Sequence, residues 1–164
     1  MLHYYRLIMI HFEYNTLWQL INENPNQITE IIEQYVTLLS HLTETPRISN
    51  ELFLHNLYEI KSMGLVYVCY YKTIEKQIFI VGSGTIIFEP KIIRSGKYVG
   101  HIEDIVVSEK CRSMGVAKTI IENLLSFAKE KGCYKVILDC NPRLSDFYGK
   151  LGFQQRGLQM SKYF

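Results

Sequence analysis

Four segments between residues 100 and 153 decide the fold that this chain is expected to adopt. They read, in order, G-H-I-E-D-I-V-V (Gly100–Val107), R-S-M-G-V-A (Arg112–Ala117), C-Y-K-V-I-L-D-C (Cys133–Cys140) and F-Y-G-K-L-G-F (Phe147–Phe153). The first and third segments are rich in β-branched residues and predict strands, whereas the second opens an amphipathic helix. The expected order is therefore strand, helix, strand and short helix. Ligands of α/β sheets bind at the carboxyl ends of strands and in the loops that follow them, so we expect a ligand site in this region.

Apolar residues at helical spacing in the first half of the chain predict two helices. One begins at Gln27 and ends before Pro46, because the residue before a proline avoids the helical region. The other follows Ser49, a favourable N-cap, and stops at Gly64. Residues 1–26 are either an N-terminal extension or contain a first strand.

Three runs of β-branched and aromatic residues predict consecutive strands over residues 65–71, 78–88 and 98–107. A short polar connection joins the first two runs and is typical of an antiparallel pair. Gly82 and Gly84 interrupt the second run and indicate a bulge or a close backbone approach. Helices on either side of such a meander predict an α/β fold, with a mixed, mostly antiparallel central sheet flanked by helices on both faces.

The bulk composition argues against several classes of protein. The 164 residues show no internal repeat or linker, which predicts one domain over residues 1–164. Eighteen Lys and Arg residues against sixteen Asp and Glu give a net charge of +2, too small for a surface that binds nucleic acid or an anionic membrane. No run approaches the roughly 18 apolar residues of a membrane helix, and the four cysteines show no zinc or C-x-x-C spacing. We therefore expect no metal, no membrane span and a reducing, cytoplasmic setting.

The loop that opens the amphipathic helix is a candidate anion site. Free backbone amides and the positive end of the helix dipole favour an anion there. Gly115 lets the backbone approach an oxygen cluster, and Arg112 and Lys118 add positive charge. The spacing is neither a dinucleotide fingerprint nor a Walker loop. Taken alone, a plain glycine-containing turn before a surface helix explains the segment better.

Three carboxylates stand at unusual places in the predicted strands. Glu103 and Asp104 lie inside an otherwise apolar strand, and strand alternation predicts that at least one of them enters the sheet interior or a cleft. Asp139 follows a buried strand at its carboxyl end, where ligands of α/β sheets bind. The structural alternatives are an exposed rim position for the pair and a turn-initiating role for Asp139.

Tyr148 lies on the predicted short helix that Gly152 ends. An aromatic pair such as Phe147 and Tyr148 more often belongs to a core than to a catalytic site. A phenol beside a leaving group could nevertheless donate a proton to it.

Taken together, these segments resemble the GCN5-related N-acetyltransferase (GNAT) superfamily. More narrowly, G-H-I-E-D-I-V-V, G-C-Y-K-V-I-L-D-C and the final M-S-K-Y-F are similar to the glucosamine 6-phosphate N-acetyltransferase family. The likeness spans roughly residues 27–164. It implies a GNAT-type fold and an acyltransferase that moves an acetyl group from acetyl-CoA to the amine of glucosamine 6-phosphate, on the route to UDP-N-acetylglucosamine.

The resemblance also implies where acetyl-CoA, the co-substrate, would bind. Its pantetheine arm would pair with the strand edge at Ile105, Val106 and Val107. Tyr148 would protonate or hydrogen-bond the leaving thiolate. The residues that would hold the pyrophosphate are Arg112, Ser113, Met114, Gly115, Val116, Ala117 and Lys118.

The resemblance further implies an acceptor site. Lys91, Arg94 and Lys135 suit a phosphate, which needs charge-assisted donors. Glu103 is the expected base, directly or through water, with Asp104 and Asp139 orienting the amine. The full set of expected substrate-binding residues is Thr43, Lys91, Ile92, Ile93, Arg94, Glu103, Asp104, Tyr134, Lys135, Asp139 and Lys162.

Members of the resembled family are homodimers in which a C-terminal strand completes the sugar site of the partner. Gly157–Phe164 is strand-like and fits that arrangement, although it could also be the edge strand of a monomer. Two positions depart from the family pattern. Leu144 replaces a frequent Asn near the cofactor, and Tyr163 stands where several members have Arg.

Two other functions remain open at this level. The chain could be a GNAT enzyme with another amine acceptor, since fold does not fix the acceptor. It could also be a CoA-binding module without turnover. The basic acceptor residues favour a phosphorylated substrate over a polyamine or peptide, and the intact Glu103, Asp104 and Tyr148 favour an enzyme.

Overall fold

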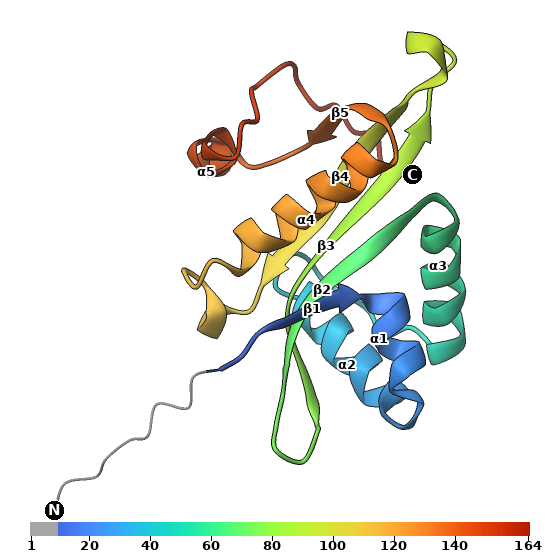
Figure 1. Ribbon diagram of the computed structural model, residues 1–164, viewed down its shortest axis with the longest axis vertical. Coiled ribbons are helices and arrows are strands. Elements are labelled where there is room, and N and C mark those ends of the chain that lie inside the picture. Colours follow the sequence, from blue (N-terminus) through green and yellow to red (C-terminus); the bar gives the residue numbers. More distant parts are fainter. Residues whose placement is uncertain (1–9) are drawn as a thin grey trace, which may run out of the picture.

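A mixed sheet forms the centre of the protein in the computed structural model, which describes residues 10–164 (Figure 1). Five strands lie side by side in chain order within this part of the chain. Neighbouring strands are antiparallel except for the last pair, which is parallel. The strands are β1 (Glu13–Thr16), β2 (Gly64–Lys72), β3 (Ile78–Pro90), β4 (Tyr98–Val107) and β5 (Cys133–Leu138). The sheet is therefore mixed and mostly antiparallel, as the sequence predicted.

Helices cover both faces of the sheet (Figure 1). Three helices pack on one face and α4 on the other, so that two apolar clusters form, one on each side. Residues Val66, Val68 and Tyr70 of β2 face the three-helix side, whereas Tyr67 and Cys69 face α4, because successive side chains of a strand alternate. The helices are α1 (Leu17–Glu23), α2 (Ile28–Leu39), α3 (Asn50–Met63), α4 (Val116–Glu130) and α5 (Ser145–Lys150).

Several predicted boundaries agree with the structure and two do not. Ser49 caps α3 by accepting a hydrogen bond from the backbone N–H of Leu52 at 3.1 Å, and α3 ends at Gly64. Helix α2 ends at Leu39, well before Pro46. The next apolar residue, Leu42, is 46% exposed, so no core contact holds a further turn. Helix α1 was not predicted, because it is only seven residues long and follows β1 without a break.

The two ends of the chain need separate comment. Residues 1–9 lie outside the described part of the chain, so the prediction for residues 1–26 is checked only in part. Strand β1, at Glu13–Thr16, favours the first-strand alternative. The strand expected over 157–164 was wrong for a single chain: that segment forms no strand. Its apolar side chains are almost fully exposed, 93% for Met160, because the segment packs on neither apolar cluster of the chain.

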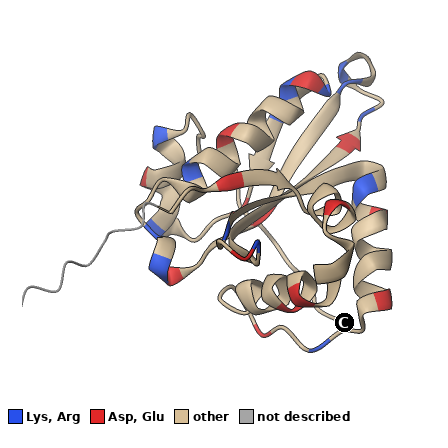
Figure 2. Cartoon of the chain, turned by 60° about the horizontal axis from the view of Figure 1, so that its bottom comes forward, with Lys and Arg blue, Asp and Glu red and all other residues tan. Residues whose placement is uncertain are grey.

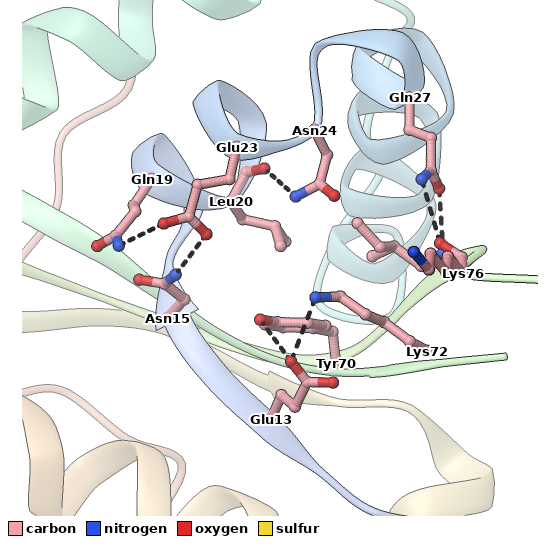
Figure 3. Close-up of polar contacts among 11 residues, drawn as sticks. Glu13, Asn15, Gln19, Leu20, Glu23, Asn24, Gln27, Tyr70, Lys72 and Lys76 are labelled. Carbon is pink, nitrogen blue, oxygen red and sulfur yellow. Dashed lines mark hydrogen bonds and ion pairs between the residues drawn. The ribbon is translucent and has the colours of Figure 1, made fainter. Parts of the chain in front are cut away.

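Polar side chains join β1 to β2 and the first helices to their neighbours, and Figure 3 shows those of Glu13, Tyr70 and Lys72 among them. The Tyr70 hydroxyl donates to Glu13 Oε2 at 3.1 Å, and Lys72 Nζ lies 3.4 Å from the same oxygen. Strand β3 extends beyond the end of β4, and glutamine side chains take the place of a neighbouring strand there. Gln34 donates to the carbonyl of Ile78 at 2.9 Å and accepts from the N–H of Ile80 at 3.0 Å. These bonds satisfy backbone groups that would otherwise be left unpaired.

Charged residues are interspersed over the helices and loops in Figure 2, as expected for a net charge of +2. No helix within residues 10–164 is long and apolar enough to cross a membrane.

A bulge separates two regular stretches of the β3–β4 pair, as Gly82 and Gly84 indicated. The register runs from Ser83 opposite Val106 to Thr85 opposite Glu103, so one residue of β3 faces two of β4. A Cβ added to Gly84 would lie 2.4 Å from Ile105 Cδ1 and 2.9 Å from Ile120 Cγ2. Glycine is required here because the bulge and α4 approach the β3 backbone too closely for a side chain.

The close approach at Gly84 is open to a direct test. Gly84→Ala should lower the free energy of unfolding by roughly 1–3 kcal/mol, because the new methyl group overpacks the contact with Ile105 and Ile120. Denaturant unfolding measures the change. Gly149→Ala is the matched control: nothing lies within 4 Å of an added Cβ in α5, so it should leave stability unchanged or raise it by up to about 1 kcal/mol. Equal effects in the two variants would contradict the packing argument.

Candidate active site

The backbone of β4 turns out of its strand at Asp104. This residue has φ 52°, in the left-handed region that non-glycine residues rarely occupy. The extra residue resets the alternation, so that Ile102 and Ile105 both pack on the α4 side while Val106 faces the three-helix side. Glu103 and Asp104 are both exposed. Of the places that the sequence left open for the pair, the sheet interior, a cleft or an exposed rim, the structure excludes the interior, because a bulge breaks the strand alternation.

Strands β4 and β5 part beside the bulge. Their parallel pairing ends with Ile102 opposite Leu138, and Asp139 follows immediately. From Glu103 to Val107, the edge of β4 on this side has no strand partner within the described residues. The opening offers free backbone groups to an extended ligand.

The structure brings Glu103, Asp104 and Asp139 together at this opening. Partial burial raises the pKa of Glu103, and the negative charges of Asp104 and Asp139 raise it further. Like charges oppose each other's ionisation. A carboxyl group whose pKa is raised in this way is a better proton acceptor near neutral pH.

Hydroxyl groups lie beneath the bulge, and the sequence analysis missed them. Ser83 and Thr85 are the buried polar residues of the described chain. The Ser83 hydroxyl donates to Tyr35 Oη of α2 at 3.4 Å. Burial raises the pKa of Tyr35 to about 12, and the nearby charge of Asp104 adds to this effect. In the sequence, Tyr35 is one of the residues at helical spacing on the apolar face of a helix. Only the tertiary structure shows that its hydroxyl lies beside the site.

The loop before α4 has the geometry expected of an anion site. Ser113 and Gly115 have φ values of 62° and 82°, and Gly115 is the N-cap of α4. No side chain caps this helix and no acidic residue lies in its first turn. The ion pairs Arg112–Glu109 (3.6 Å) and Lys118–Glu122 (3.8 Å) are exposed, so they are weak. The amides at the start of α4 therefore face solvent and favour an anion.

Tyr148 is almost completely buried at the base of α5. Its ring meets Phe147 and Phe153 edge to face, with centroids 5.0 and 5.9 Å apart. Burial raises the pKa of Tyr148, and the nearby Cys140 raises it further. The phenol therefore keeps its proton at neutral pH and can act as a donor.

The expected phosphate-binding residues gather at the other end of β4. The Arg94 guanidinium lies 5.6 Å and Lys135 Nζ 5.8 Å from the ring centroid of Tyr134. Lys91 precedes Arg94 in the same hairpin, and the side chains of Ile92 and Ile93 between them are exposed. Five residues of strand separate Tyr98, opposite Cys133, from Glu103, a distance of roughly 16 Å.

A single chain therefore does not assemble the whole set of expected substrate residues. Thr43 lies on the turn after α2 and Lys162 on the C-terminal tail, and both are exposed. No hydrogen bond or ion pair among residues 10–164 links either of them to the three carboxylates.

Residues 30–153 match the model of the acetyltransferase (GNAT) family. The chain belongs to the GNAT acetyltransferase family. The parted strands, the bulge and the uncapped helix N-terminus are thus parts of a GNAT domain, and the fold expected from the sequence is confirmed.

Similar proteins show which members of the GNAT family this chain resembles. The glucosamine 6-phosphate N-acetyltransferase of Arabidopsis thaliana is 36% identical over 138 residues, covering 84% of this chain and 93% of the relative. That of Trypanosoma brucei brucei is 39% identical over 132 residues, covering 79% and 86%. The crystal structure of the Arabidopsis enzyme matches with a TM-score of 0.79 at 32% identity, over 94% of this chain and 99% of that one. The resemblance to the glucosamine 6-phosphate N-acetyltransferases is confirmed.

Residues 10–164 contain no group of three or more His, Cys, Asp or Glu side chains placed to hold a metal ion. All four cysteines are free.

The role of the α4 N-terminus can be separated from its backbone strain. Gly115→Ala and Gly132→Ala both place an alanine at φ near +80°, with nothing within 4 Å of the new Cβ. Each should therefore cost about 1–2 kcal/mol of stability. In this GNAT protein, Gly115→Ala should also raise the KM for acetyl-CoA about tenfold, because it displaces amides that bind an anion. Steady-state kinetics check this, and an equal rise in Gly132→Ala would contradict it.

Proposed function

We propose that this protein is a glucosamine 6-phosphate N-acetyltransferase, which transfers the acetyl group of acetyl-CoA to the amine of D-glucosamine 6-phosphate. The observation that carries the proposal is the cluster of Glu103, Asp104 and Asp139 at the opening between β4 and β5. The relatives described above support this acceptor. The products are CoA and N-acetylglucosamine 6-phosphate, a precursor of UDP-N-acetylglucosamine.

Acetyl-CoA would enter as a co-substrate along the free edge of β4. The backbone groups of Ile105, Val106 and Val107 on this edge would pair with the amides of the pantetheine arm. The pyrophosphate would bind the amides at the start of α4, with Arg112 and Lys118 adding charge. Exposed Met114, at 52%, lies in the same loop beside Ser113.

The acceptor amine arrives largely as an ammonium ion and must lose a proton before it attacks. Glu103 takes this proton, directly or through a water molecule, because its raised pKa suits a base near neutral pH. Asp104 and Asp139 attract the ammonium group and orient it. A cation among three carboxylates also relieves their mutual repulsion.

Acetyl transfer then proceeds by direct attack. The amine nitrogen forms a bond to the thioester carbonyl carbon, and the negative charge collects on the oxygen. A backbone N–H of residues 105–107 donates to that oxygen. The C–S bond then breaks, Tyr148 donates its proton to the departing thiolate, and the nitrogen loses its second proton to solvent, from which Tyr148 regains a proton. No bond forms between the enzyme and the acetyl group.

The phosphate of the acceptor needs cations that can donate charge-assisted hydrogen bonds. Lys135 lies opposite Val99, four positions along β4 from Glu103 and roughly 13 Å away, and Arg94 lies over the ring of the neighbouring Tyr134. We propose a homodimer, in which each sugar site combines the carboxylates of one copy with residues of the other. The exposed apolar tail, including Leu158 and Met160, supports this proposal, because a second copy would cover apolar side chains that a single chain leaves in solvent.

Three acceptors test the proposed function. Glucosamine 6-phosphate should give a kcat/KM at least about tenfold above those of glucosamine and glucosamine 1-phosphate, since one charge-assisted hydrogen bond to a correctly placed phosphate is worth this much. Release of the CoA thiol measures the rate. Faster reaction with spermidine or a peptide amine would point to another acceptor. If no amine gives thiol release, the remaining alternative is a CoA-binding module without turnover.

Removal of residues 162–164 tests the proposed dimer. The shortened chain should dissociate more readily in analytical ultracentrifugation and show a higher KM for glucosamine 6-phosphate. The KM for acetyl-CoA serves as the internal control and should stay within about twofold, since the proposed coenzyme site lies within one chain. A monomer with full activity would refute the arrangement.

A further inference from the structure

Three further ionisable side chains, those of Glu89, Lys91 and His101, lie in a row that leads toward Glu103 on the same face of the sheet. Glu89, at the end of β3, holds two partners with its two carboxylate oxygens. Oε1 accepts a hydrogen bond from Lys91 Nζ, and Oε2 lies 2.8 Å from His101 Nε2. These hydrogen bonds, first from Lys91 and then from His101, hold the pKa of Glu89 below its usual range. We call Glu89, Lys91 and His101 the Glu89 network.

The β3–β4 register places His101 next to Glu103. Ile87 pairs with His101, and Thr85 pairs with Glu103, without irregularity between them. Residues two apart in a strand point to the same face and lie about 7 Å apart. The network therefore ends beside the proposed base.

The charges around Glu103 are otherwise negative. Asp104 lies next to it on β4 and Asp139 follows β5, while Tyr35 of α2 is a neutral phenol. Among the described groups that act on Glu103, only His101 opposes the raised pKa caused by burial and by the two aspartates. Lys91 is engaged by Glu89 at the far end of the network. One imidazolium is therefore the local cation available to offset three carboxylates.

We propose that His101 is a positioning residue for acetyl transfer: Glu89 holds it beside Glu103, where its positive charge on the acidic side of neutrality keeps Glu103 ionised and able to accept a proton. This inference rests on the proposed function only for its effect on turnover. Histidine carries a proton in this pH range, and Lys91 fixes Glu89 so that its second oxygen faces the imidazole. His101 touches no reacting atom in this scheme and acts through Glu103.

The pH dependence of activity distinguishes this role from a structural one. His101→Gln should lower kcat/KM for glucosamine 6-phosphate about threefold at pH 5.5, the effect in water of one unit charge about 7 Å away. At pH 8.5 the change should be smaller than about 1.5-fold, if the effect comes from positive charge on the histidine and not from packing. The acidic limb of the plot of kcat/KM against pH should thus move to higher pH in this variant. An equal loss at both pH values, or an unchanged profile, would overturn the proposal.

Two further variants complete the kinetic comparison. Glu89→Gln keeps hydrogen-bonding capacity but removes the charge that holds the imidazolium, so it should shift the acidic limb in the same direction. An unshifted limb in this variant would contradict the role of Glu89. His55→Gln is the matched control, since His55 is exposed on α3, and its profile should coincide with that of the unmodified protein.

A titration without turnover separates this proposal from the proposed function. The carboxyl carbon of Glu103 can be followed by 13C NMR in the free protein, assigned by its loss in Glu103→Gln. In His101→Gln its midpoint should move to higher pH, whichever amine the enzyme acetylates. An unmoved midpoint would refute the role of His101, whereas failure to acetylate glucosamine 6-phosphate would refute only the proposed acceptor.

Discussion

The structure depends on one irregularity, the bulge at Asp104 opposite Gly84. One extra residue in β4 turns the strand away from β5, and the absence of a side chain at Gly84 lets Ile105 and α4 close over the gap. A regular strand here would continue its pairing with β5 and leave no free edge. The same extra residue places Glu103 and Asp104 at the mouth of the opening instead of in the core. The free edge of β4 and the cluster of carboxylates are thus both consequences of a single change of register.

The two layers of helices support the bulge from opposite sides. On one face, α4 packs Val116 and Ile120 against the glycines of β3 and so fixes its own N-terminus near the opening. On the other face, α2 brings Tyr35 to the hydroxyls of Ser83 and Thr85. A left-handed non-glycine residue is strained, and such strain persists where the surroundings hold it.

Electrostatics divide the sheet face into two regions. The carboxylates collect where β4 leaves β5, and the cation–aromatic group of Arg94, Tyr134 and Lys135 lies at the other end of the pair. The Glu89 network lies between them and connects the hairpin of Lys91 to the strand of Glu103. An acceptor with an ammonium group and a phosphate requires both kinds of charge.

The sequence by itself determined the class of sheet, the strands from Gly64 onward, the cap at Ser49 and the motifs that mark a GNAT domain, because propensity, periodicity and capping are local properties. It also indicated the bulge through Gly82 and Gly84. It missed α1 and the hydroxyl of Tyr35, and it placed the end of α2 nearer to Pro46 than Leu39. These features follow from contacts between distant residues: the packing of α2 on β3, and the absence of a core contact at Leu42. Tertiary structure alone decided which side chains meet at the opening, because packing of α2 and α4 on the two faces of the sheet sets that geometry.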